Sequence, residues 1–166
     1  MLSNTVQNAI NEQIKNEIYS AYLYLSMSAH FESASLLGLA HWMRVQSQEE
    51  LGHALKFYDY VLDRGGKVIL QAIDQPPVDW TSPLELFNQV LEHERKVTGL
   101  IHKLNDLAIK ENDYATQVML QWFITEQVEE EKNATQIIDQ LKMIEARESG
   151  ILMLDHRLRK RGESED

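Results

Sequence analysis

A chain of 166 residues, 43% of them hydrophobic, is long enough to bury the core of one domain and too apolar for a disordered one. Its formal charge of −10 opposes binding to nucleic acid and favours attraction of cations. The lack of cysteine excludes disulfides, zinc–thiolate sites and iron–sulfur clusters. No apolar segment approaches the roughly 20 residues of a membrane span, and "MLSNTVQNAINEQ" lacks an apolar signal region. We therefore expect a cytoplasmic protein without membrane contact.

Helix start and stop signals predict an all-α fold in a single domain over residues 1–166. The segment 82–85, "SPLE", is typical of a capping box with proline in the first helical turn. The pair Gly65-Gly66 is a stop signal, and Asn112 or Asp113 can cap the helix that follows. The predicted helices cover 4–33, 36–65, 83–111, 113–147 and 150–161.

The segment 66–82, between the second and third predicted helices, determines the topology. Fully extended it reaches about 56 Å, more than the roughly 42 Å of a helix of about 28 residues. The other connections are short, which makes their helices antiparallel, whereas the second and third helices can be parallel, as in a four-helix bundle with one long crossover. The crossover is unusually apolar, so either its own helices or a second subunit should cover it. Its apolar residues are Val68, Ile69, Leu70, Ile73, Val78 and Trp80.

Each long predicted helix carries an apolar stripe that one glutamate interrupts near its middle. These glutamates are Glu17, Glu50, Glu94 and Glu130, with His53 and Gln127 on the same stripes. One such glutamate alone is more often a boundary residue that reaches water, and one such histidine is more often a core or surface residue. Four carboxylates at matching heights would repel one another, by about 4 kcal/mol for a pair 4 Å apart at a dielectric near 20. No Lys or Arg lies on these stripes, so the pattern predicts bound cations.

The donor atoms indicate which cations these are. Carboxylate oxygens with one imidazole and no sulfur are typical of Fe²⁺ or Mn²⁺ sites. Glu50 and His53 lie on adjacent turns of one face, with β-carbons about 5–6 Å apart. Glu50 is then placed to bridge two ions, and the charges of four carboxylates balance those of two ferrous ions. The sequence predicts a di-iron site.

With these motifs, the chain resembles a prokaryotic non-haem ferritin over its full length. The resemblance rests on "NEIYSAYLYLSM", "HWMRVQSQEELGHALKFYDYVLDRGG", "HERKVTG" and "FITEQVEEE", which surround the four glutamates. It implies the ferritin-like bundle with a short fifth helix, and a function in iron storage and detoxification. It also implies a ferroxidase centre that oxidises Fe²⁺ with O₂ or H₂O₂, and a homo-oligomeric 24-mer shell in which Fe³⁺ forms a mineral.

The resemblance also assigns roles to residues. It places the first iron on Glu17, Glu50 and His53, and the second on Glu50, Glu94 and Glu130, with Gln127 close by. Tyr24 and Trp122 match aromatic residues beside the centre that lend an electron, although ordinary core packing explains them equally well.

The same resemblance implies a third iron site and the absence of haem. Glu49, Glu126 and Glu129 resemble the third iron site of bacterial and archaeal members, although Glu129 also fits a solvated charge run. Haem-binding relatives carry a methionine where this chain has Leu51, and a second histidine motif where it has Gln127-x-x-Glu130. We therefore expect no haem.

The basic residues of the C-terminal tail have a simpler interpretation. Arg157, Arg159, Lys160 and Arg161 are placed to complement the C-terminal end of a helix dipole. By resemblance, the fifth helix lines four-fold channels of the shell.

Three alternative functions also fit an acidic helical bundle. DNA-protecting mini-ferritins lack the fifth helix and place their ligands between subunits, whereas these ligands lie within one bundle. A rubrerythrin-like peroxidase or a di-iron oxygenase is a second alternative, although the absence of cysteine removes a rubredoxin module. A non-catalytic interaction module leaves four core glutamates unexplained, because each buried charge costs several kcal/mol.

Overall fold

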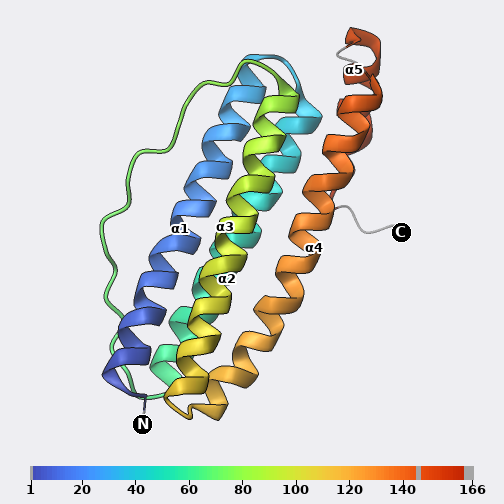
Figure 1. The fold of residues 1–166 in the computed structure, drawn as a ribbon. Helices are drawn as coiled ribbons and strands as arrows, with labels where there is room; N and C mark the ends of the chain where they lie inside the picture. Colours follow the sequence, from blue (N-terminus) through green and yellow to red (C-terminus); the bar gives the residue numbers. More distant parts are fainter. Residues whose placement is uncertain (1, 145–146, 163–166) are drawn as a thin grey trace.

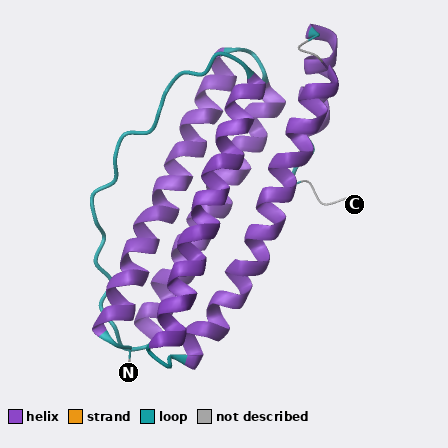
Figure 2. Cartoon of the chain, in the orientation of Figure 1, coloured by secondary structure: helices purple, strands orange, loops and turns teal. Residues whose placement is uncertain are grey.

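The computed structural model describes residues 2–144 and 147–162, which form five α-helices and no β-strand. The helices are α1 (Asn4–Ser33), α2 (Leu37–Asp63), α3 (Pro83–Lys110), α4 (Tyr114–Ile144) and α5 (Glu148–Leu158). The first four form a bundle in which α2 and α3 run in the same direction (Figure 1). One long crossover joins them along the outside of α1 (Figure 2). The predicted all-α bundle with one crossover and a short fifth helix is confirmed, and no described helix is long and apolar enough to cross a membrane.

The helix ends follow from local capping chemistry. Ser82 Oγ accepts a hydrogen bond from Glu85 N, and Asp113 Oδ1 accepts one from Thr116 N, so both predicted caps form. The second helix ends two residues before Gly65, whose φ of +70° is incompatible with continuing the helix. The fourth helix was predicted to reach residue 147, and residues 145–146 of that prediction lie outside the described chain.

Polar contacts fasten the crossover to α1. Asn11 accepts a hydrogen bond from Ile69 N at 2.8 Å and donates one to the Lys67 carbonyl at 3.0 Å. Farther along the crossover, Ser26 Oγ donates to the Pro77 carbonyl at 2.6 Å. Several apolar crossover side chains stay exposed even so, and Leu70 is 66% exposed. The bundle therefore holds the backbone of the crossover but does not cover all of its apolar surface.

The core of the bundle consists of two apolar clusters with a polar layer between them. One cluster includes Met27, Phe31, Leu39, Phe87 and Ile137. The other includes Ile10, Phe57, Ile101, Leu120 and Phe123. The predicted stripe glutamates lie between these clusters in sequence on all four long helices. We call this layer the polar belt.

The fifth helix is attached to the N-terminus of α2 by one buried carboxylate. Leu36, at the N-cap position of α2, provides no side-chain acceptor. Asp155 Oδ1 of α5 instead accepts hydrogen bonds from Gly38 N at 2.7 Å and Leu39 N at 2.9 Å. A Cβ at Gly38 would lie 1.7 Å from the Asp155 backbone oxygen, so glycine is what allows α5 to approach this closely. Two of the free N–H groups at the start of α2 are thus satisfied from another helix.

Replacing this cap should destabilise the protein measurably. Asp155→Ala leaves the Gly38 and Leu39 N–H groups without their acceptor, so we expect the free energy of unfolding to fall by about 1–2 kcal/mol. Asp155→Asn keeps an acceptor oxygen and serves as the matched control, with a smaller loss. Chemical denaturation measures both variants, and an Asp155→Ala protein as stable as the parent would show that the cap contributes nothing.

Candidate metal centre

The polar belt gathers seven buried side chains from all four long helices. Each of them is at most 5% exposed. They are Glu17, Gln46, Glu50, His53, Glu94, Gln127 and Glu130. The regular 3.6-residue repeat of each helix turns these side chains toward the bundle axis together with the apolar residues above and below them. The structure therefore brings together every residue that the sequence predicted for the di-iron site.

The first group of potential metal ligands lies between α1 and α2. Ligand atoms of Glu17, Glu50 and His53 lie within 4.8 Å of one another. His53 Nδ1 is 3.3 Å from Glu50 Oε2. Glu17 Oε1 accepts a hydrogen bond from Gln13 Nε2 at 2.7 Å, but Glu17 Oε2 is buried without any donor. A buried carboxylate oxygen without a donor is costly, and a cation bound here would satisfy it.

The second group shares the same histidine. Ligand atoms of His53, Glu126 and Glu130 also lie within 4.8 Å of one another. Glu126 Oε1 is 3.8 Å from His53 Nε2, and its side chain is 29% exposed, at the edge of the belt. The two ring nitrogens of His53 thus face different carboxylates, Glu50 on one side and Glu126 on the other.

Glu94 lies in the belt but in neither group of the described residues, and both of its oxygens have hydrogen-bond donors. The Tyr24 hydroxyl donates to one oxygen, and Gln127 Nε2 donates to the other at 3.1 Å. Gln127 Nε2 also lies 3.2 Å from the Glu94 backbone carbonyl. Glu94 can therefore bind an ion through a second lone pair of either oxygen or by exchanging one of these partners.

Two glutamines of the centre had no role in the sequence analysis. Gln46 Nε2 donates to Glu50 Oε1 at 3.2 Å and to Glu130 Oε2 at 2.8 Å, and so links α2 to α4. Gln13 and Gln46 each lie four residues before the site glutamate to which they donate, the spacing at which helical side chains meet. That spacing is the sequence signal that identifies them.

Burial and mutual repulsion change the acidity of the whole centre. Loss of solvation, followed by the charge of Glu50, raises the pKa of Glu17 well above its usual value. Loss of solvation and the neighbouring carboxylates raise the pKa of Glu50 in the same way. The pKa of Glu94 is also raised, chiefly by burial, and that of Glu130 rises to about 8, chiefly by burial and then by Glu94. At neutral pH the metal-free centre therefore holds protons that bound cations would displace.

The residues predicted for a third iron site are not gathered together. Glu49 is exposed, and its Oε2 accepts a hydrogen bond from Arg161 Nη2 at 2.5 Å. Glu129 is exposed, and within the described chain neither it nor Glu49 belongs to the two ligand groups. Of the three, Glu126 alone reaches the belt.

The two predicted aromatic residues differ in burial and in the residues that they contact. Tyr24 is completely buried, and burial followed by the charge of Glu94 raises its pKa well above its usual value. Trp122 is 39% exposed, and its ring centroid lies 5.4 Å from that of His53.

Comparison with known proteins places this geometry in a family. Residues 7–144 match the family model for the ferritin-like domain. The chain belongs to the ferritin family. It is 49% identical over 161 residues to a bacterial non-heme ferritin of Bacteroides fragilis, covering 97% of this chain and 100% of the relative. A bacterial non-heme ferritin of Staphylococcus epidermidis is 42% identical over 144 residues, which cover 87% of each chain. The predicted resemblance is confirmed.

Solved structures agree with this assignment. An open-pore ferritin of the hyperthermophilic archaeon Archaeoglobus fulgidus aligns with a TM-score of 0.96 and 49% identity, covering 97% of this chain and 99% of that one. A form of that ferritin engineered to be closed aligns with the same TM-score. Membership of the ferritin family supports a function in iron storage.

The raised pKa values predict how stability depends on pH. Between the usual glutamate value of 4.5 and the value of about 8 for Glu130, the folded metal-free protein binds more protons than the unfolded chain. The free energy of unfolding should therefore fall as the pH rises through this range. Glu130→Gln removes one titrating group, so the decline becomes shallower by up to about 1.4 kcal/mol per pH unit. Denaturation of chelator-treated protein at several pH values measures this, with exposed Glu32→Gln as the control. Parallel declines in parent and Glu130→Gln would contradict the pKa assignment.

Proposed function

We propose that this protein is a ferroxidase that stores iron inside a shell built from its own copies. The observation that carries the proposal is the burial of four carboxylates at the middle of one bundle, with one oxygen of Glu17 lacking any donor. Such a set is unfavourable without positive charge and well suited to two divalent cations. Family membership supports iron as the cation.

Ferrous iron is the substrate, and the belt residues bind it in two positions. Glu17, Glu50 and His53 bind one Fe²⁺, and this is supported by their mutual distances. Glu50 and Glu130 bind the second Fe²⁺, with Glu94 joining after it releases Tyr24 or Gln127. Glu50 then bridges the two ions. Each ion displaces carboxyl protons, since only ionised carboxylates are ligands.

The oxidation of Fe²⁺ can be written as a balanced reaction with either O₂ or H₂O₂. Two Fe²⁺ with O₂ and two H⁺ give two Fe³⁺ and H₂O₂, and two Fe²⁺ with H₂O₂ and two H⁺ give two Fe³⁺ and two H₂O. Tyr24 is placed to replace one Fe²⁺ as an electron donor to H₂O₂, so that one Fe²⁺, the Tyr24 phenol, H₂O₂ and one H⁺ give one Fe³⁺, a tyrosyl radical and two H₂O. The Glu94 oxygen to which the Tyr24 hydroxyl donates can accept the phenol proton. Fixed ligands on four rigid helices hold both ions close together, which favours the two-electron step.

The surface of the single chain supports assembly with further copies. Large apolar side chains on α1, α2 and the crossover are about half exposed or more. They include Tyr22, Leu25, Leu51, Leu55, Leu70 and Val78. Large exposed apolar side chains are a feature of subunit interfaces. We infer a homo-oligomeric shell, a 24-mer by family resemblance, into which Fe³⁺ passes to form the mineral.

Removing the bridging carboxylate tests the ferroxidase assignment. Glu50→Ala leaves the two ions without a shared ligand, so we expect the rate of rapid Fe²⁺ oxidation to fall by about tenfold or more. The metal-free variant should remain folded, because the substitution removes a charge that repels its neighbours. Stopped-flow absorbance after mixing with Fe²⁺ in air measures the rate, with exposed Glu32→Ala as the control. Oxidation by Glu50→Ala at the parental rate would disprove the bridging role.

A second set of variants separates the third site from the main centre. Glu49→Ala with Glu129→Ala should preserve the first rapid oxidation of about two Fe²⁺ per chain, since neither side chain lies in the belt. The variant should change the iron oxidised per O₂ and slow later turnovers. Glu126→Ala should also slow the first phase, because Glu126 lies 3.8 Å from His53. Simultaneous measurement of absorbance and oxygen uptake distinguishes residues of the main centre from residues of a third site. Loss of the first phase in the double variant would place both residues in the main centre.

A further inference from the structure

Arg161, in the segment that follows α5, lies against α2 next to the metal centre. Arg161 donates to Gln46 Oε1 at 2.7 Å, to Glu49 Oε2 at 2.5 Å and to the Trp42 carbonyl at 3.3 Å. Its guanidinium carbon also lies 4.1 Å from the centroid of the Trp42 ring. The backbone carbonyl of Arg161 accepts a hydrogen bond from His41 Nε2 at 2.8 Å. Both the backbone and the side chain of Arg161 are therefore held in place.

Arg161 determines which way the buried Gln46 amide points. A side-chain amide has one oxygen, which only accepts, and one NH₂ group, which only donates. Because Gln46 Oε1 accepts from Arg161, its NH₂ group must face the other way, toward Glu50 and Glu130. The rotated amide would direct its oxygen at two carboxylates and its NH₂ group at a guanidinium. Gln46 is wholly buried, so water cannot relieve those contacts.

We propose that Arg161 is a positioning residue for the metal centre and acts through Gln46. It fixes the amide so that one oxygen of Glu50 and one of Glu130 are hydrogen-bonded, which leaves their other oxygens to bind the ion that these two carboxylates share. The inference rests on the proposed function, since it concerns the same pair of carboxylates. It makes the segment after α5, outside the four-helix bundle, a support of the site.

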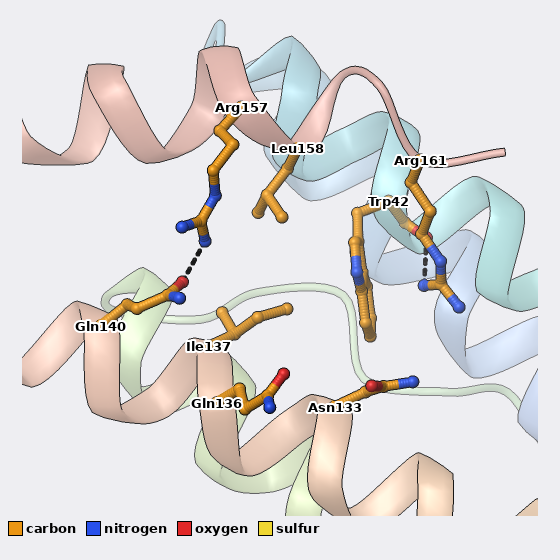
Figure 3. Close-up of a pocket in the computed structure, with 8 residues that line it drawn as sticks. All are labelled: Trp42, Asn133, Gln136, Ile137, Gln140, Arg157, Leu158 and Arg161. Atoms are coloured by element: carbon orange, nitrogen blue, oxygen red, sulfur yellow. Dashed lines mark hydrogen bonds between the residues drawn. The ribbon is translucent and has the colours of Figure 1, made fainter. Parts of the chain in front are cut away.

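A purely structural role for Arg161 makes a different prediction, and the chain offers a matched control. Arg157 lies near the end of α5, lines the same cavity of about 320 Å³ between α2, α4 and α5, and also donates to a glutamine, Gln140 (Figure 3). Gln140 makes no contact with the belt among the interactions of the described residues. If Arg161 only fastens the tail, the loss of either arginine should have the same effect.

Binding of Co²⁺ to the assembled protein without oxidant separates these roles. Co²⁺ takes the same ligands as Fe²⁺, and its visible absorption spectrum reports ligand geometry independently of turnover. In Arg161→Gln we expect about tenfold weaker Co²⁺ binding and an altered spectrum, the size of effect typical for outer partners of metal ligands. Arg161→Lys keeps the charge and one donor, so it should recover part of the loss. Arg157→Gln should match the parent in both affinity and spectrum.

A double-mutant cycle tests the path through Gln46. Gln46→Met removes the amide at similar volume and should weaken Co²⁺ binding at least as much as Arg161→Gln. Adding Arg161→Gln to Gln46→Met should then change nothing further, because the two residues act on the same hydrogen bonds. Thermal unfolding and particle size show that each variant is folded and assembled.

Four results would overturn the inference. They are parental or tighter Co²⁺ binding by Arg161→Gln, an equal loss in Arg157→Gln, additive losses in the double variant, and an unchanged spectrum. A parent protein that binds no Co²⁺ would contradict the proposed function together with the inference. Equal Co²⁺ binding by the parent and by Arg161→Gln would contradict the inference but leave the proposed function intact.

Discussion

The burial of four carboxyl groups at one level of a helical bundle is the constraint on which the rest of this structure depends. Glu17, Glu50, Glu94 and Glu130 are each at most 5% exposed, and they divide the apolar core into two clusters. A protein that buries carboxyl groups in such a layer stays folded only if protons or cations neutralise them or hydrogen-bond donors stabilise them. The molecule supplies the donors from three glutamines and one tyrosine, and the raised pKa values show that protons complete the balance in the metal-free state.

The same constraint explains how the centre suits a substrate that must arrive and then leave. Metal binding here displaces carboxyl protons, and the release of these protons offsets part of the charge that the cations bring. Glu94 is the carboxylate whose oxygens are both engaged, by Tyr24 and Gln127. In the proposed function, an ion that binds Glu94 is therefore the one whose arrival and departure rearrange these hydrogen bonds. Glu17, with one oxygen free of donors, offers a prepared position for the other ion.

Most of the fold was predictable because it rests on local patterns. Apolar stripes, the Ser82 cap and the length of the crossover are properties of neighbouring residues, and the structure agrees with them. The belt residues were predictable from a similar pattern, since four glutamates at matching heights on four apolar stripes stand out together. The interpretation of the basic tail as a set of charges complementing a helix dipole was incomplete. Arg161 instead contacts Gln46, Glu49 and Trp42, which lie more than a hundred residues away in sequence. Such pairings have no periodic signal, and the cap that Asp155 provides for α2 was missed for the same reason.

The residues predicted for a third iron site show what helical spacing cannot predict, namely contacts between distant parts of the chain. The resemblance grouped Glu126 with Glu49 and Glu129, and the structure puts Glu126 beside His53. Spacing could not reveal that Glu49 is engaged by an arginine from the tail, because that contact depends on where α5 docks. The fixed position of α5 thus influences both the main centre, through Gln46, and the carboxylate next to it.

The most direct test of the metal centre is a crystal structure of the protein soaked with Fe²⁺ under anaerobic conditions, with iron located by its anomalous scattering. We expect two iron positions inside the polar belt, one bound by Glu17, Glu50 and His53 and one shared by Glu50 and Glu130, with Glu94 turned away from Tyr24 or Gln127. Iron found only at surface carboxylates, with the belt hydrogen bonds unchanged, would contradict the central claim that the buried carboxylates exist to bind iron.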